Sequence, residues 1–395
     1  MVQALHSAGL GVVMDVVYNH TYYSNSWLER TVPGYWNRRW ENGSVTNGSG
    51  CGCDLASERT MVRKYLVDSC VYWAKEYHID GFRFDLMALH DVETMNAIRA
   101  ALDALPGGED ILMYGEPWQG GSTRMEHGAV PANKQAAGLL DSRIGFFCDN
   151  TRDAIKGGVF NAGSAGYING DMHCGYQVLH SIPAWRGGQA DFMPQAPGQV
   201  VQYVSAHDNY TLWDKLKCVA RRRDYAVPDA DLLAQNRMAA GIYLTCQGLP
   251  FMQGGEEFAR TKHGDHNTYR GPLELNRLDW TRAAQLEELV QYYHGLLEIR
   301  KAYPELSGMA GDAEPCILSL PGWLIGFVPE RRGESLPGRL AVYYNPERTR
   351  QWAALPAGSW RYLCDGTRAA AEPFGPACRN AIELAPVSVT ILKVE

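Results

Sequence analysis

The sequence predicts an α/β fold with a parallel sheet, followed by an antiparallel β region. The first observation is an alternation, from Gly11 to about Gly255, of short apolar runs with longer amphipathic segments, which is typical of strand and helix units around a parallel sheet. The second is a change after a helix expected over Thr281–Tyr303, where short strands with turn signals follow, such as CILSLPGWLIGFV and GRLAVYYN. Because 395 residues can form one large and one smaller domain, we expect a first domain over residues 1–304 and an antiparallel β domain over residues 305–395.

The same alternation predicts the individual elements. The clearest helix is expected to begin after Ser57, a good N-cap residue. Its apolar positions recur at near-helical spacing, at Met61, Tyr65, Val67, Val71 and Trp73. Two long insertions, Thr21–Leu55 and Gln119–Leu140, have the composition of substrate-binding loops. The expected strands are Gly11–Val17, Asp80–Asp85, Ile111–Gly115, Ile144–Cys148, Val200–Ala206 and Leu249–Gln253.

Composition and charge exclude several classes of function. With 46% hydrophobic and 21% charged residues, the chain has the composition of a soluble globular protein. The 37 basic and 44 acidic residues give a net charge of −7 without a basic block, so we expect neither nucleic acid nor a membrane as partner. The sequence shows neither a membrane-spanning apolar run nor a signal-peptide pattern. Ten cysteines at irregular spacings are typical of reduced thiols, so we expect a cytoplasmic protein.

Charged residues lie within or directly after the expected strands. In IDGFRFDLMALH, Arg83 and Asp85 are two residues apart, so their side chains leave the strand on the same face. A guanidinium in hydrogen-bonding range keeps a carboxylate ionised, as a nucleophile requires. Standing alone, the pair is equally compatible with a structural ion pair.

A second carboxylate follows the next expected strand, in LMYGEPW. Glu116 lies there between Gly115 and Pro117, with Tyr114 and Trp118 nearby. Aromatic neighbours desolvate a carboxyl group and raise its pKa, which suits a general acid at neutral pH. Taken by itself, such a glutamate is more often a turn residue.

Two further strands end in polar residues in the same way. The strand expected over Val200–Ala206 continues into His207 and Asp208. The first expected strand contains Asp15 and is followed by Asn19 and His20. Because active sites of alternating strand and helix barrels lie at the carboxyl ends of the strands, we expect all these residues at one rim.

The two carboxylates match the pair required for retaining glycoside hydrolysis. Asp85 would attack the anomeric carbon, and Glu116 would protonate the leaving oxygen and then activate water. Asp208 and the histidines would hold sugar hydroxyls. Aromatic residues are available to stack on sugar rings, although core packing is the better expectation for any single one: Trp36, Trp40, Trp118 and Tyr269.

Four stretches, DVVYNH, GFRFDLMALH, YGEPW and VSAHDN, resemble in order the four signature regions of the α-amylase superfamily, glycoside hydrolase family 13. Further stretches, SGCG before DLASE, AKEYHIDGFRFD and GGEEFARTKHGDHNTY, are most similar to the type I pullulanase group. These are debranching enzymes that cleave α-1,6 bonds in pullulan and branched glucans. The resemblance covers essentially the whole chain and weakens toward the carboxyl terminus.

The resemblance implies a role for each matching residue. The family's nucleophile falls on Asp85, its acid/base on Glu116 and its transition-state stabiliser on Asp208. Asp15 matches an aspartate that is largely architectural near the site. The residues expected to bind substrate are Asn19, His20, Arg83, Trp118, His207 and Tyr269.

The implied fold is a (β/α)8 TIM barrel, incomplete here, followed by a C-terminal antiparallel β-sandwich. The family's first two barrel strands precede the DVVYNH stretch, so strands three to eight are expected to be present. Met1 resembles an internal methionine of the helix before the third strand. We therefore expect the carboxyl-terminal part of a longer enzyme.

The expected substrate is an α-glucan, namely pullulan, branched starch or glycogen. The chemistry calls for no cofactor, and a structural calcium ion and the oligomeric state are left open. The C-x-C pair of Cys51 and Cys53 is weak evidence for zinc, so loop packing is favoured there. Cys53 also departs from close relatives of the family, which tend to have Asn.

Alternative functions remain open. A glucan transferase such as a branching enzyme, or another α-amylase-type hydrolase, would share the catalytic trio. A catalytically silent fragment that at most binds glucan is a further alternative, because six barrel strands leave two open sheet edges.

Overall fold

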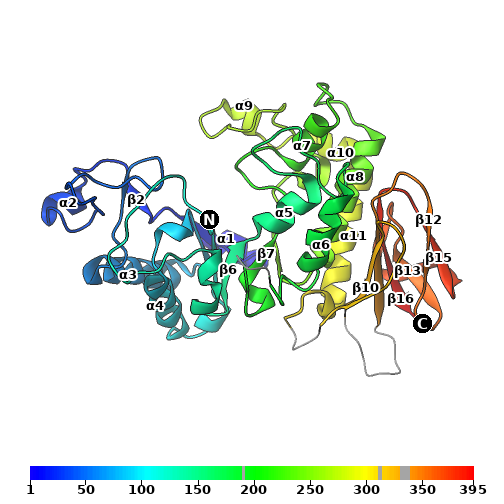
Figure 1. Cartoon of the computed structure of the whole chain (residues 1–395), viewed down its shortest axis with the longest axis horizontal. Coiled ribbons are helices and arrows are strands. Elements are labelled where there is room, and N and C mark those ends of the chain that lie inside the picture. The colour runs from blue at the N-terminus through cyan, green and yellow to red at the C-terminus, as the bar shows by residue number, and fades with distance from the viewer. Residues whose placement is uncertain (189–191, 310–313, 330–338) are drawn as a thin grey trace. The chain divides into compact units, whose positions relative to one another are not determined.

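The computed structural model describes residues 1–188, 192–309, 314–329 and 339–395. The chain forms two compact units (Figure 1). The first comprises residues 1–147 and 185–201, and the second comprises residues 148–184 and 202–395. These units divide the chain differently from the expected boundary at 304/305, which stays a prediction.

A parallel sheet confirms the predicted α/β class. Its strand order is β1-β4-β5-β6-β7-β8, and the pairings from β1 to β7 are parallel. Each of the six predicted strands is present but shorter than expected: β1 and β4 are shorter at both ends, β5 at its amino end, and β6, β7 and β8 at their carboxyl ends. The strands are β1 Val13–Val16, β4 Gly81–Phe84, β5 Leu112–Gly115, β6 Ile144–Phe147, β7 Val200–Gln202 and β8 Leu249–Pro250.

The helices of the first unit correct one expectation. Arg59 occupies the N-cap position of helix α3 without a capping hydrogen bond from its side chain, and the Ser57 hydroxyl donates to Asp91 instead of capping the helix. Its buried face is formed by Val62, Leu66, Cys70 and Ala74, four residues apart, while Met61 and Tyr65 are exposed. This unit contains α1 Val2–Ser7, α2 Trp27–Thr31, α3 Thr60–Tyr77 and α4 Val92–Asp103, with the short strands β2 His20–Thr21 and β3 Cys53–Asp54 in the first predicted loop.

The second unit holds longer helices and the antiparallel strands. The helix expected over Thr281–Tyr303 is divided at Leu286 into α10 and α11. The helices of this unit are α5 Asp149–Lys156, α6 Gly175–Ser181, α7 Leu212–Val219, α8 Ala230–Thr245, α9 Leu273–Asn276, α10 Trp280–Gln285 and α11 Glu287–Ala302.

The antiparallel region forms two sheets, with orders β14-β13-β16-β11-β10-β9 and β12-β15. Side chains alternate along β11: Val342 and Tyr344 join the core formed with α8 and α11, whereas Ala341 and Tyr343 join the core that includes β12 and β15. The strands are β9 Cys316–Ile317, β10 Ile325–Val328, β11 Leu340–Asn345, β12 Gln351–Ala354, β13 Trp360–Cys364, β14 Ala369–Cys378, β15 Ala381–Leu384 and β16 Ser388–Val394.

Within the described part of the chain, helices are too short or too polar to cross a bilayer.

Candidate active site

Arg83 organises the polar end of the first unit's sheet. It lies on β4 in register with Asp15 on β1. Its Nη1 donates to Asp15 Oδ1 at 2.8 Å and to Asp85 Oδ1 at 3.0 Å, and its Nη2 lies 2.7 Å from Glu116 Oε1. Burial opposes the charged form of Arg83, but Glu116, Asp15 and Asp85 together raise its pKa above the ordinary value. One guanidinium therefore joins three carboxylates.

The Asp85 carboxylate is held at both oxygens. Arg83 occupies Oδ1, and Asn19 Nδ2 donates to Oδ2 at 2.9 Å and to the Asp85 carbonyl at 2.8 Å. Asn19 is fully buried and Arg83 is 7% exposed. Both residues contact Asp85 from buried positions and so orient this carboxylate, while their expected substrate contacts stay a prediction.

His20 is connected to Asp85 through Asn19. Since the Asn19 amide nitrogen donates to Asp85, its oxygen accepts, and His20 Nδ1 donates to it at 2.5 Å. Partial burial lowers the pKa of His20, against the charges of Asp85 and Asp54. The imidazole is therefore neutral at neutral pH, with Nδ1 protonated.

Glu116 makes two contacts that the sequence did not indicate. Its carboxylate contacts Arg83, and its Oε2 accepts the backbone N–H of Leu86 at 2.9 Å. Glu116 is buried and has these charged and polar partners, while the desolvation by aromatic neighbours that the sequence predicts stays a prediction. The sequence could not reveal these partners, because β4 and β5 bring Arg83 and Glu116 together only when the strands pair.

The backbone around the two carboxylates is specialised. Leu86, directly after Asp85, has a φ of 40°. A leucine in this left-handed region is strained, and such strain occurs at functional sites. It aims the Leu86 N–H at Glu116. Before Glu116, a Cβ on Gly115 would lie 2.7 Å from the Phe84 carbonyl oxygen, so this close approach requires glycine.

Sequence reasoning missed the residue that shapes the first loop. Asp54 is fully buried and accepts hydrogen bonds from the Thr46 hydroxyl and from the Gly48 and Ser49 amides. It pairs with His20 in the β2–β3 ladder. An aspartate following a glycine-rich turn is the signal that could have identified it.

The remaining candidates are divided between the two units. Trp118 is half-buried two residues after Glu116, in the first unit. His207, Asp208 and Tyr269 belong to the second unit, and each unit is described by itself. The His207 and Asp208 side chains are 61% and 64% exposed, with His207 Nε2 3.7 Å from Asp208 Oδ1. Tyr269 is 72% exposed, and the Arg270 guanidinium lies over its ring.

Over the described ranges, the structure holds no group of three His, Cys, Asp or Glu side chains arranged to bind a metal ion. All ten cysteines, Cys51 and Cys53 included, are free thiols. The cluster of Asp85, Glu116 and Arg83 in the first unit is suited to acid, base and nucleophilic chemistry by carboxylates.

Comparison with known proteins gives a consistent result. No family model matches the chain. It is 41% identical over 311 residues to a pullulanase of Bacillus subtilis (strain 168), covering 77% of this chain and 41% of that protein. A solved pullulanase from Bacillus acidopullulyticus superposes with a TM-score of 0.89 at 35% identity, covering 99% of this chain and 47% of that one. A pullulanase from Anoxybacillus sp. LM18-11 complexed with maltotetraose gives 0.88 at 32% identity, covering 100% and 55%.

Proposed function

Because this chain is a homologue of the pullulanases, we propose that it is a retaining glycoside hydrolase that cleaves α-1,6-glucosidic bonds. Its substrates would be α-glucans such as pullulan and the branches of starch or glycogen. The relative solved with maltotetraose supports this substrate class. The observation that carries the proposal is the cluster in which Arg83 joins Asp85 and Glu116.

Asp85 is the nucleophile of the proposed reaction. Its carboxylate oxygen forms an ester bond to the anomeric carbon, while the bond from that carbon to the leaving sugar oxygen breaks. Arg83 and Asn19 hold both carboxylate oxygens, which fixes the orientation of Asp85 before attack.

Glu116 is the acid and then the base. Asp15, Asp85 and Glu116 share one guanidinium, so three negative charges face one positive charge. The acid step requires one proton on Glu116 before the leaving oxygen departs. Glu116 gives this proton to the leaving oxygen, and recovers one from the water that hydrolyses the Asp85 ester. Asp208 stabilises the flattened, positively charged sugar in the transition state.

Product analysis of the 395-residue chain on pullulan tests the proposal. We expect release of maltotriose with new reducing ends. Asp85→Asn should abolish the release, and Glu116→Gln should slow it by about 10²- to 10⁴-fold. Altered branching without new reducing ends would identify a transferase, and absence of any change in the glucan would refute the proposed activity.

A further inference from the structure

The segment that carries His207 and Asp208 needs an external support. Both side chains are more than half exposed, and the 3.7 Å between them is too long for a direct hydrogen bond. Asn209, next in the chain, has a φ of 61° in the left-handed region. The direction of the Asp208 side chain therefore depends on what holds the backbone of residues 205–209.

Lys262 holds this backbone on both sides of Asp208. Its Nζ donates to the carbonyl oxygen of Asn209 at 2.7 Å and to that of His207 at 3.2 Å. Lys262 is 1% exposed, so the ammonium group makes these contacts away from bulk water. A buried charge–dipole contact of this kind is stronger than a surface one.

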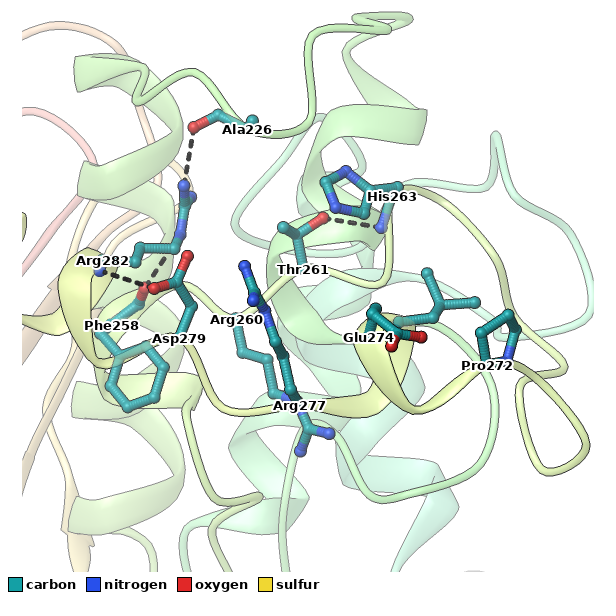
Figure 2. A pocket seen from close by; sticks show the side chains of 11 residues that line it. Ala226, Phe258, Arg260, Thr261, His263, Pro272, Glu274, Arg277, Asp279 and Arg282 are labelled. Carbon is teal, nitrogen blue, oxygen red and sulfur yellow. Dashed lines mark hydrogen bonds between the residues drawn. The ribbon is translucent and has the colours of Figure 1, made fainter.

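Lys262 is itself fixed by its neighbours. The Asp214 carboxylate on α7 accepts the Lys262 backbone N–H at 2.7 Å and also the Thr261 hydroxyl. The His263 N–H donates to the same Thr261 hydroxyl at 2.9 Å, which closes the turn around Lys262 (Figure 2). Thr261 and His263 also line a pocket of about 480 Å³, whereas Lys262 does not. The turn therefore directs Lys262 away from this pocket.

A second contact supports the start of the same segment. The Ser205 hydroxyl donates to Glu256 Oε2 at 2.5 Å, and Glu256 is buried. Tyr243 on α8 and Tyr293 on α11 both donate to Glu256 Oε1. Glu256 and Lys262 are six residues apart, so one stretch of chain holds residues 205–209 at both ends.

We propose that Lys262 is a positioning residue that fixes Asp208 for catalysis by holding the peptide carbonyls before and after it. The inference rests on the proposed hydrolysis, in which Asp208 stabilises the transition state. Lys262 touches no substrate and acts only through Asp208. Its loss should therefore affect the turnover number more than substrate binding.

Lys262→Met removes the ammonium group and keeps a similar side-chain volume. On pullulan we expect kcat to fall by about 10²-fold, the scale of a displacement of about 1 Å at a catalytic group, with KM changed by less than about threefold. Adding Asp208→Asn should cause no further loss beyond that of Asp208→Asn alone, because both changes remove one contribution. Lys262→Arg, which keeps a charged donor, should restore part of the activity.

Lys215→Met is the matched control. Lys215 is also fully buried, and its Nζ donates to three carbonyls of another loop, those of Gly158 at 2.8 Å, Asn161 at 2.7 Å and Ala162 at 3.3 Å. This variant loses a comparable buried contact, but one that does not hold the backbone beside Asp208. The kcat of its folded form should therefore stay within about threefold of the parent value. Equal kcat losses in both variants, or additive losses of Lys262→Met and Asp208→Asn, would overturn the proposal.

Amide hydrogen exchange separates this inference from the proposed function. The amides of residues 203–212 should exchange faster in Lys262→Met than in the parent chain, and at the parent's rate in Lys215→Met. Both results are expected whether or not the chain hydrolyses pullulan. An inactive parent chain would refute the hydrolase, and exchange would then decide on Lys262 alone. If Lys262→Met does not fold, Lys262→Gln takes its place in both measurements. Unchanged exchange of residues 203–212 would refute the support by Lys262.

Discussion

Arg83 is the residue on which the charge balance of the first unit depends. Replacing it with leucine leaves three clustered carboxylates without their shared cation. Since removing one partner of a buried ion pair leaves uncompensated charge, we expect Arg83→Leu to lower the free energy of unfolding by about 3 kcal/mol. Urea unfolding at pH 7 measures this loss.

Arg143→Leu provides the control for Arg83. Arg143 also pairs with two carboxylates, those of Asp103 and Asp141, but its side chain is 43% exposed. Exposed pairs contribute only about 0–1 kcal/mol, because water and salt screen them. A loss in Arg143→Leu as large as that in Arg83→Leu would contradict the assigned role of burial.

Glu256 gives the second unit a distinct dependence on pH. Burial raises its pKa from an ordinary 4.5 to about 7, despite hydrogen bonds from Ser205 and Tyr243 and the nearby charge of Lys156. Between these two values the folded protein keeps a proton that the unfolded chain releases. The stability from this group is therefore complete below pH 4.5 and is lost as the pH rises through about 7.

Glu256→Gln removes this dependence, because glutamine does not titrate. A pKa difference of this size corresponds to about 3 kcal/mol, so the difference in free energy of unfolding between parent and variant should change by that amount from pH 4 to pH 8. Denaturant unfolding at several pH values follows this difference. Buried Lys156, whose pKa burial lowers to about 7, also responds to the charge of Glu256, so the difference between the two profiles includes the response of Lys156 to the substitution. Parallel pH profiles of the two proteins would show that Glu256 does not titrate as described.

The catalytic candidates could be found from the sequence, but their mutual contacts could not. Asp85 and Glu116 follow predicted strands, so their location at strand ends follows from hydrophobic patterning. The sharing of Arg83 depends on the register between β4 and β5, which the sequence does not specify. Lys262 carries no signal of its own, because its partners are backbone carbonyls distant in the chain.

At the scale of elements, helix α11 packs closely against strand β14. A Cβ on Gly295 would lie 2.0 Å from the carbonyl oxygen of Ala369, a backbone atom that cannot move aside cheaply. Alanine favours helices over glycine by about 1 kcal/mol, but the clash should dominate. We expect Gly295→Ala to reduce the free energy of unfolding by about 1–3 kcal/mol in urea titrations.

Gly138→Ala is the matching substitution at an open position, where a Cβ would meet nothing within 4 Å. It should leave the free energy of unfolding unchanged within about 0.5 kcal/mol. If Gly295→Ala were equally neutral, the close packing of α11 on β14 would be wrong.

The predicted strands were found because apolar runs between polar segments are a strong local signal. The buried face of α3 was predicted wrongly, because Met61 and Tyr65 alternate with Val62 and Leu66 and both sets fit a helical period. Which set is buried depends on the neighbouring elements. The prediction that Ser57 caps the helix was wrong for a similar reason, since the Ser57 hydroxyl donates to Asp91 on a distant segment.

At the scale of the whole molecule, similarity to solved pullulanases extends over 99% of the chain, which spans 47% of the Bacillus acidopullulyticus protein. The first unit carries Asp85 and Glu116, and the second carries Asp208 with its support from Lys262. The second unit also joins helices α8 and α11 to the antiparallel sheet through one core. The expected boundary at 304/305 could not anticipate this, because α11 lies before it in sequence and packs on strands that follow it.

Covalent trapping of the intermediate tests the central claim most directly. A maltotriosyl fluoride with an extra ring fluorine that slows hydrolysis of the glycosyl-enzyme should add one maltotriosyl unit to the chain. Mass spectrometry of peptides should place this unit on Asp85, and Asp85→Asn should abolish it. A chain that hydrolyses pullulan with the unit on another residue, or a chain that neither takes the unit nor releases maltotriose, would contradict the assignment of Asp85 as the nucleophile.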